Sequence, residues 1–384
     1  MKCGTESRAN QGLSARVTRQ AVTDELRLRI VGGRYHPDAR LPVCEDLARD
    51  LGASHVTVLR GIDQLRREGF LRTQRRSGVY VTPHPPHLFE CAMLFGKEDG
   101  CQHDDRYHRV LSAEIRNAGA LPGPWRVSAM HGADPDPDSL AYRALVRRVQ
   151  HGGYAGLIFP HAPDLWHGTP LVECPGIARV ATSLAPDSHL GISVVRIDTS
   201  AYLDRALVRV AESGCRRVAV LLPPCVLQAE TPEAEYDDVM QRIVGHGLRT
   251  EPYWVVQISQ RQDTALRRLA HLLLAAPAAR CPDAIVVMDD HMTESVTLGV
   301  RDAGVAVPRS LLLVTYCNFP DRPPAHVPVT RLGFDCHELF RMMIDAIETQ
   351  RRTGRVTETS LQPVFEEELA NGATQEETQR EETV

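Results

Sequence analysis

The chain has 384 residues, of which 43% are hydrophobic and 24% are charged, and its formal net charge is −5. This length predicts two or three domains, and the composition is typical of globular proteins. The net negative charge argues against a protein that binds nucleic acid over its whole surface. No apolar run approaches the roughly 18 residues of a membrane span, and the N-terminal residues lack the apolar stretch of a secretory signal. We therefore expect a cytoplasmic protein without a membrane anchor.

Charge is distributed unevenly along the chain. Residues 16–84 hold 13 Arg against 8 Asp and Glu, whereas residues 366–384 hold 7 Glu and one Arg. The positive charge therefore lies in a segment about as long as one small domain. We predict that residues 1–15 are disordered and that residues 367–384 form a disordered acidic tail.

The N-terminal block begins with a segment of helical periodicity. Val22, Leu26 and Ile30 recur at positions i, i+4 and i+8, so they form one face of a helix over residues 17–31. A loop follows, and it leads into a second predicted helix over about residues 43–51.

A third helix begins sharply after the second. Gly52 can adopt the left-handed conformation that ends a helix, and Ser54 is a favourable N-cap for the next one. The inward stripe of this third helix begins at Val58, and the segment FLRTQRRSGVYV that ends at residue 81 predicts two short strands joined by an Arg-rich turn. Three helices and a hairpin make a winged helix-turn-helix, while an ordinary helical hairpin in a core is the alternative for the helices.

Proline marks the clearest domain boundary. The segment TPHPPH, residues 82–87, favours a stiff, extended connection. Beyond it, short apolar runs alternate with amphipathic segments, which is typical of an α/β fold with parallel sheets. The predicted strands are LFECAMLF, WRVSAM, AGLIFP, ARVATS, SVVRI, RRVAVLL, YWVVQI, DAIVVM and SLLLVTY, and the helices span about 106–118, 138–151, 200–213, 233–246, 261–275, 291–303 and 335–350. We predict a winged helix-turn-helix over residues 16–82 and two three-layer lobes over residues 88–366.

The N-terminal block carries a series of residues that resembles the GntR family of bacterial regulators. The matching positions are Ile30, Gly33, Tyr35, Pro37, LP at 41–42, DLA at 46–48, LGAS at 51–54, TV at 57–58, LRREGFL at 65–71 and SGVYV at 77–81. The resemblance implies a domain that binds a double-stranded DNA operator. The candidate DNA contacts are Ser54, His55, Thr57, Arg60, Arg72, Arg75 and Arg76.

Three arginines of the GntR pattern are absent. Their positions hold Glu45, His55 and Leu59, and the first glycine of the wing falls on Arg76. Phosphate neutralisation and Arg–guanine pairs supply affinity and discrimination, so these changes weaken or redirect DNA binding unless arginines such as Arg60 compensate. A winged helix that mediates protein contacts instead is the alternative.

Four segments of the larger block carry a second resemblance, to the effector domain of the LacI/GalR family. They are YAGLIFP at 154–160, VVRIDTSAYLDRALVRVAESGCRRVAVLL at 194–222, PDAIVVMDDHMTESVTLGVRDAGVAVPRSLLLVTYCN at 282–318 and VPVTRLGFDCHELFRMMIDAI at 327–347. The family shares the two-lobed, periplasmic-binding-protein-like fold. The resemblance implies a homodimer through the large domain and a small-molecule effector, a sugar or polyol, bound between the lobes.

Candidate effector contacts lie beyond strand ends, because ligands bind at the carboxyl ends of strands in open parallel sheets. Asp290 aligns with the ligand-binding Asp of the family, Asp289 with its Asn neighbour, and Asn318 with a second Asp. Capping of the next helix is the alternative for Asp290. Four further candidates, with surface-loop or packing roles as alternatives, are Tyr107, His161, Asp164 and Trp166. Glu235 falls near the effector-binding Arg of the family, which favours a neutral effector over an acidic one.

Signatures of enzymes are missing from the sequence. The aminotransferase-like domain of some GntR-type regulators needs a lysine for pyridoxal phosphate, yet the only lysines are Lys2 and Lys97, without a matching motif. No nucleophile elbow, Walker A loop, HExxH motif or dinucleotide fingerprint occurs, and none of the ten cysteines forms a CxxC pair. We expect no enzyme activity, no cofactor and no bound metal.

Overall fold

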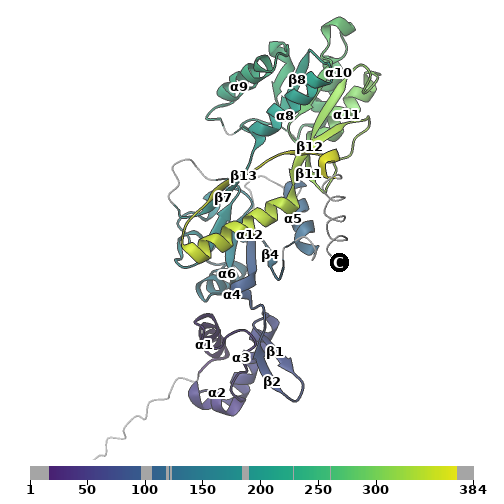
Figure 1. Cartoon of the computed structure of the whole chain (residues 1–384). Coiled ribbons are helices and arrows are strands. Elements are labelled where there is room, and N and C mark those ends of the chain that lie inside the picture. Colours follow the sequence, from purple (N-terminus) through teal and green to yellow (C-terminus); the bar gives the residue numbers. More distant parts are fainter. Residues whose placement is uncertain are drawn as a thin grey trace, which may run out of the picture.

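A computed structural model describes residues 17–96, 106–117, 121, 123–183, 190–227, 229–259 and 261–369. It contains a small N-terminal head, a first lobe in the middle and a second lobe at the far end (Figure 1). Residues 1–15, which were expected to be disordered, lie outside the described residues, as does the tail predicted over residues 367–384 beyond residue 369. Within the described ranges, no helix combines the length and apolar character needed to cross a membrane.

The head is the predicted winged helix-turn-helix. Its elements are α1 (Arg19–Val31), α2 (Cys44–Asp50), α3 (His55–Arg67), β1 (Leu71–Gln74) and β2 (Gly78–Val81). The two strands pair antiparallel, and α1 packs on α3 around buried Val22, Leu26 and Val58. Gly61 allows this packing, because a Cβ at that position would lie 2.8 Å from a Val22 methyl.

The first lobe is a parallel sheet between two helical layers. Its strand order is β13-β7-β6-β5-β3-β4. The strands are β3 (Glu90–Phe95), β4 (Arg126–His131), β5 (Gly156–Phe159), β6 (Ala178–Ala181), β7 (Ser193–Ile197) and β13 (Glu358–Leu361). The α-helices are α4 (Pro86–Phe89), α5 (Arg106–Arg116), α6 (Leu140–Gln150), α7 (Pro170–Glu173) and α12 (Cys336–Thr353). Helices α5 and α12 cover one face of the sheet, and α6 and α7 cover the other.

The second lobe repeats this three-layer plan. Its strand order is β14-β12-β11-β10-β8-β9, with only the short β14 antiparallel to its neighbour. The strands are β8 (Val218–Leu222), β9 (Val255–Gln257), β10 (Ala284–Val287), β11 (Leu312–Phe319), β12 (Thr330–Asp335) and β14 (Val364–Phe365). The α-helices are α8 (Thr199–Glu212), α9 (Pro232–Gly245), α10 (Asp263–Leu273) and α11 (Met292–Asp302). The predicted α/β class with parallel sheets is therefore confirmed.

The chain crosses between the lobes after β7, after β12 and again between β13 and β14. The last crossing returns the chain to the second lobe and holds the first acidic residues of the predicted tail there. Glu367 pairs with Arg209 at 2.8 Å, and Glu368 pairs with Arg205 at 2.6 Å. Ordered structure therefore continues past residue 366, because arginines on α8 attract these carboxylates.

The linker joins the head to the first lobe through His87. Its ring stacks on Phe70 of the head, with ring centroids 5.8 Å apart. Arg351, near the C-terminal end of α12, donates hydrogen bonds to the main-chain oxygens of Leu88 at 2.8 Å and His87 at 3.3 Å. The N-terminal end of α12 is capped by Asp335, the last residue of β12 in the second lobe. This helix therefore connects the border between the lobes to the linker of the head.

Burial of His87 gives the stability of the protein a pH dependence. Burial and the Arg351 guanidinium lower the pKa of His87 from 6.5 to about 4. Folding favours the neutral ring of His87. Its contribution to the free energy of unfolding is therefore fully present above about pH 6.5 and is lost as the pH falls toward 4. We expect wild-type protein to lose on the order of 1–2 kcal/mol more than His87→Leu between pH 7.5 and pH 5.

Thermal unfolding followed by circular dichroism at both pH values measures this difference. The exposed His36, changed to Leu, is the control and should retain the wild-type pH response. Equal acid sensitivity of His87→Leu and wild type would show that His87 does not set the dependence.

Candidate functional site

Helix α3 of the head presents a polar outer face. Ser54 caps it, because its Oγ accepts a hydrogen bond from the Thr57 N–H at 3.1 Å, and the two hydroxyl oxygens lie 2.7 Å apart. His55 and Arg60 are exposed on this helix, whereas Val58 is fully buried. The first turn of α3 therefore offers side chains and main-chain N–H groups to a surface outside the head.

Two apolar side chains share that outer region. Val56 is 55% exposed and Leu59 is 42% exposed. Apolar groups on a helix in the major groove contact thymine methyl groups, so both suit DNA as well as protein. The sequence placed Leu59 near the outer face of this helix but did not single out Val56, whose position two residues before inward-facing Val58, off the buried stripe, was the available signal.

An acidic residue reduces the positive charge at the start of α3. Glu45 on α2 is 69% exposed, and its Oε1 lies 3.5 Å from His55 Nε2. Where a GntR-type domain carries an arginine, this chain therefore has a carboxylate beside the recognition helix.

Arginines of the wing differ in their availability. Arg75 and Arg76 are exposed in the turn between β1 and β2, and Arg76 has a φ of 59° where the GntR pattern has glycine. Arg72 instead donates to Asp38 at 2.9 Å, and its guanidinium lies 5.4 Å from the centre of the Tyr80 ring. A DNA contact by Arg72 would have to share or break the pair with Asp38.

A second group of polar residues lies where the lobes meet. Asp290 follows β10, and Asn318 lies on the adjacent β11. Asn318 Nδ2 donates to Asp290 Oδ2 at 3.0 Å, and each residue is only 4% exposed. The residue at the N-cap of α11 is His291, without a side-chain capping bond, so Asp290 does not serve as that cap.

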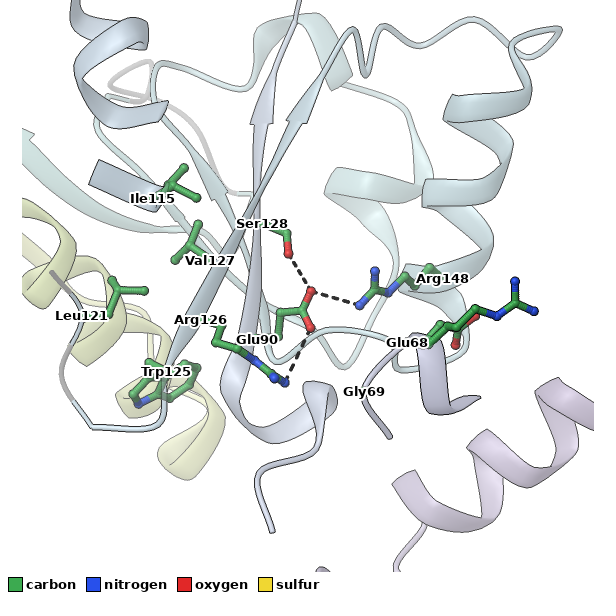
Figure 2. Close-up of a pocket in the computed structure, with 11 residues that line it drawn as sticks. Glu68, Gly69, Glu90, Ile115, Leu121, Trp125, Arg126, Val127, Ser128 and Arg148 are labelled. Carbon is green, nitrogen blue, oxygen red and sulfur yellow. Dashed lines mark hydrogen bonds and ion pairs between the residues drawn. The ribbon is translucent and has the colours of Figure 1, made fainter. Parts of the chain in front are cut away.

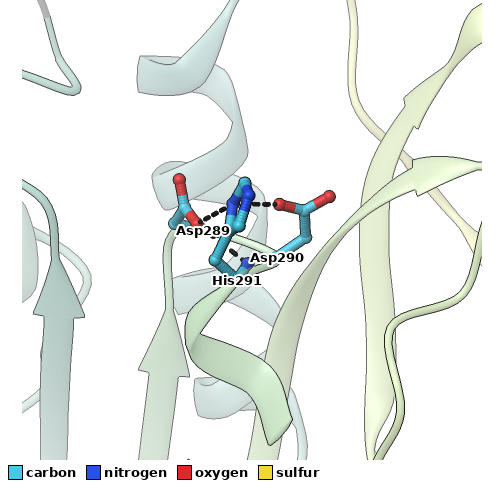
Figure 3. A group of neighbouring side chains, drawn as sticks. All are labelled: Asp289, Asp290 and His291. Carbon is cyan, nitrogen blue, oxygen red and sulfur yellow. Dashed lines mark hydrogen bonds and ion pairs between the residues drawn. The ribbon is translucent and has the colours of Figure 1, made fainter. Parts of the chain in front are cut away.

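His291 bridges the two adjacent carboxylates, as Figure 3 shows. Its Nδ1 lies 3.1 Å from an oxygen of Asp289 and 3.1 Å from an oxygen of Asp290. Burial opposes a charged ring, but these carboxylates raise the pKa of His291 to about 10, while burial raises the pKa of Asp289. The potential ligand atoms of the three residues lie within 4.8 Å of one another. This cluster could therefore hold a cation in the place of the His291 ring proton.

Arg106, the first residue of α5, reaches this cluster from the first lobe. Its guanidinium pairs with Asp321, and its Nε lies 3.6 Å from Asp290 Oδ2. Its main-chain N–H donates to Nε2 of His291 at 3.1 Å, a contact that disfavours a second ring proton and so opposes the effect of the carboxylates. The sequence analysis named the adjacent Tyr107 but missed Arg106, although it too lies beyond the end of β3.

Two of the predicted effector residues have structural contacts that account for their side chains. Trp166 is 5% exposed, donates from Nε1 to the Ala133 carbonyl at 2.7 Å and packs on Phe159, so it belongs to the core of the first lobe. Glu235 is fully buried, and its carboxylate accepts from the main-chain N–H groups of Cys225 at 2.7 Å and Leu227 at 2.6 Å. These amides already satisfy the charge, so Glu235 holds the loop after β8.

The other predicted contacts remain predictions. His161 and Asp164 are exposed after β5, and the His161 ring lies 5.5 Å from the ring of Tyr107. The structure thus brings together Asp289, Asp290 and Asn318 on the second lobe. On the first lobe it places Tyr107 beside His161, whereas Asp164 lies in the short helical turn Asp164–Trp166.

Comparison with known proteins identifies the head. Residues 18–81 match the family described as "Bacterial regulatory proteins, gntR family". The head is a gntR-family domain. Over 63 residues the chain is 40% identical to the "Probable rhizopine catabolism regulatory protein MocR" of Rhizobium meliloti. This match takes in 16% of the present chain and only 13% of that relative, so the chain spans a small part of the relative's length.

A different family model matches most of the second lobe together with α12 and β13 of the first lobe. Residues 208–366 match a "Periplasmic binding protein-like domain". A regulatory protein of the LacI family from Chloroflexus aggregans has the same fold, with a TM-score of 0.54, 19% identity and coverage of 72% of this chain and 96% of that one. The "transcriptional regulator CelR-cellobiose complex" gives a TM-score of 0.51 at 16% identity, covering 85% of this chain and 98% of that one. The predicted joining of a gntR-family domain to a LacI-like fold is confirmed.

The buried carboxylate of Glu235 has a structural role that a substitution can test. Glu235→Ala leaves two main-chain N–H groups without their acceptor, so we expect it to destabilise the second lobe by about 1–3 kcal/mol. Thermal unfolding provides the measurement. Glu233→Ala, at an exposed position on the same turn of α9, is the matched control and should unfold like wild type. Identical melting of both variants would contradict this role.

Proposed function

We propose that the protein is a transcription regulator in which a gntR-family domain over residues 16–82 binds operator DNA. A small, neutral, sugar-like effector binds between the lobes of the domain over residues 88–366 and controls that binding. The protein acts as a homodimer and is not an enzyme. The observation that carries this proposal is that one chain combines an exposed helix and wing with a buried Asp290–Asn318 pair, at a carboxyl sheet edge of the second lobe that faces the first lobe.

The DNA role rests on the outer face of the head. Exposed Arg60, Arg75 and Arg76 supply positive charge on α3 and the wing, and phosphate contacts of this kind provide much of the affinity for DNA. The capped N-terminus of α3 adds main-chain donors. A homodimer would double these contacts on a two-fold operator.

The effector role rests on the chemistry between the lobes. A buried carboxylate paired with an amide offers acceptors and a donor to ligand hydroxyl groups, as sugar recognition needs. The relative of the same fold in complex with cellobiose supports this ligand class. Arg106 already joins the two lobes at this point, so a ligand that enters must rearrange that contact and thereby change lobe closure.

A second function is favoured by a specific observation on α3. Exposed Val56 and Leu59, together with Glu45 beside His55, also suit a protein partner. In that case the head would bind a protein under effector control, and its DNA affinity would be low.

DNA binding can be tested by selection of duplexes from a random library, followed by fluorescence anisotropy on the selected duplex. We expect log affinity to fall linearly with log salt, and Arg75→Ala combined with Arg76→Ala to lower affinity about 10- to 100-fold and reduce the slope by about 2. Arg143→Ala, at an exposed position on α6, is the control. Failure to select any duplex at low salt would favour the protein-partner function.

Effector binding can be tested by a thermal-shift screen with mono- and disaccharides. A ligand bound between the lobes raises the melting temperature, and Asp290→Asn should remove at least part of that shift because it loses the buried charge. Asp138→Asn, at an exposed position before α6, should keep it. A sugar shift that is the same in Asp290→Asn and wild type would place the ligand elsewhere.

A further inference from the structure

A cavity of about 410 Å³ lies where the head meets the first lobe (Figure 2). The residues that line it are Arg67, Glu68, Gly69, Glu90, Ile115, Leu121, Trp125, Arg126, Val127, Ser128 and Arg148. Three of them belong to the end of α3 and the turn that follows, and the others belong to the first lobe. Its volume falls in the range of small-molecule sites, which occur preferentially between domains.

Both carboxylates of the cavity already have partners. Glu90, which is 8% exposed, accepts from Ser128 Oγ at 2.7 Å and from Arg148 at 3.0 Å. Glu68 accepts from Arg27 at 2.7 Å and from Gln64 at 2.8 Å. Neither carboxylate therefore needs a cation from outside.

The arginine side chains that line the cavity have fewer hydrogen-bond partners than these carboxylates. Arg126 is 51% exposed in its side chain, donates to the His84 carbonyl at 3.3 Å and stays 3.9 Å from Glu90. The Nε of Arg148 has no hydrogen-bond partner among the described residues, but it is buried and cannot be reached from the cavity. With the carboxylates paired, the half-exposed Arg126 guanidinium is the donor available to a ligand, and the group that it attracts is an anion such as a carboxylate or a phosphate.

The other part of the cavity wall is apolar. Trp125 is 9% exposed and Val127 is 7% exposed, and Ile115 and Leu121 lie beside them in Figure 2. Glu90, Ser128 and Arg148 line the cavity from the opposite face of the edge strand β4. A ligand that fits both parts has an anionic end and a compact apolar body.

We propose that this junction cavity binds a small organic anion with a ring-sized apolar body, and that the bound anion fixes the head against the first lobe. The site is separate from the effector cluster at Asp290, which lies at the border of the second lobe. A ligand here contacts the end of α3 directly, so it restricts the orientation of the recognition helix without requiring lobe closure. The chain would then respond to two chemically different ligands.

The test titrates the full chain with benzoate, phenyl phosphate, inorganic phosphate and neutral benzyl alcohol by isothermal calorimetry. We expect saturable, equimolar binding of benzoate or phenyl phosphate and at least about tenfold weaker binding of benzyl alcohol. Benzoate and phenyl phosphate separate a carboxylate from a phosphate preference, and inorganic phosphate shows whether the apolar body is needed.

Two variants locate the binding. Arg126→Ala removes a half-exposed donor, and Leu121→Trp fills the apolar part; each should weaken the anion at least about tenfold. Arg143→Ala and Asp290→Asn should leave it unchanged, with circular dichroism confirming that every variant is folded. The proposal is overturned if neither aromatic anion binds at millimolar concentration, or if binding survives both cavity variants. Loss of binding in Asp290→Asn alone would also overturn it, by assigning the anion to the effector cluster.

Discussion

Parallel strand pairing is the constraint on which the two lobes depend. Parallel neighbours need helical crossovers, and these cover both faces of each sheet and collect the carboxyl ends of the strands along one edge. Asp290 and Asn318 therefore meet although they belong to successive strand–helix units. Because the chain passes between the lobes three times, that edge also faces the first lobe, and Arg106 can reach it.

Periodicity made most of the fold predictable from sequence. The apolar stripe of Val22, Leu26 and Ile30 identified the first helix, and Ser54 marked the start of α3 through its capping chemistry. The seven helices predicted in the lobes all occur close to their expected limits, because each combines a core-facing stripe with a polar face. Strands β12, β13 and β14 were not predicted, since Arg331 and Gly333 interrupt the apolar pattern of β12, β13 is a polar edge strand and β14 has only two residues.

Side-chain environments were less predictable than elements. The position of Asp290 and Asn318 at strand ends was predicted, but their hydrogen bond was not, and the burial of Trp166 and Glu235 depends on loops whose paths the sequence does not reveal. Arg106 matters only because another lobe approaches it, and the junction cavity exists only because α3 ends beside β4. Contacts between units that lie far apart in the chain leave no local pattern in sequence.

The 18 residues of α12 give this helix a mechanical consequence. At 1.5 Å per residue it is about 27 Å long, so a tilt of about 2° at one end displaces the other by roughly 1 Å. One end carries His337, which is held 2.6 Å from Glu114, and the other carries Arg351 on the linker carbonyls. A rigid helix of this length converts a small rotation at the lobe crossing after β12 into a displacement of the proline linker.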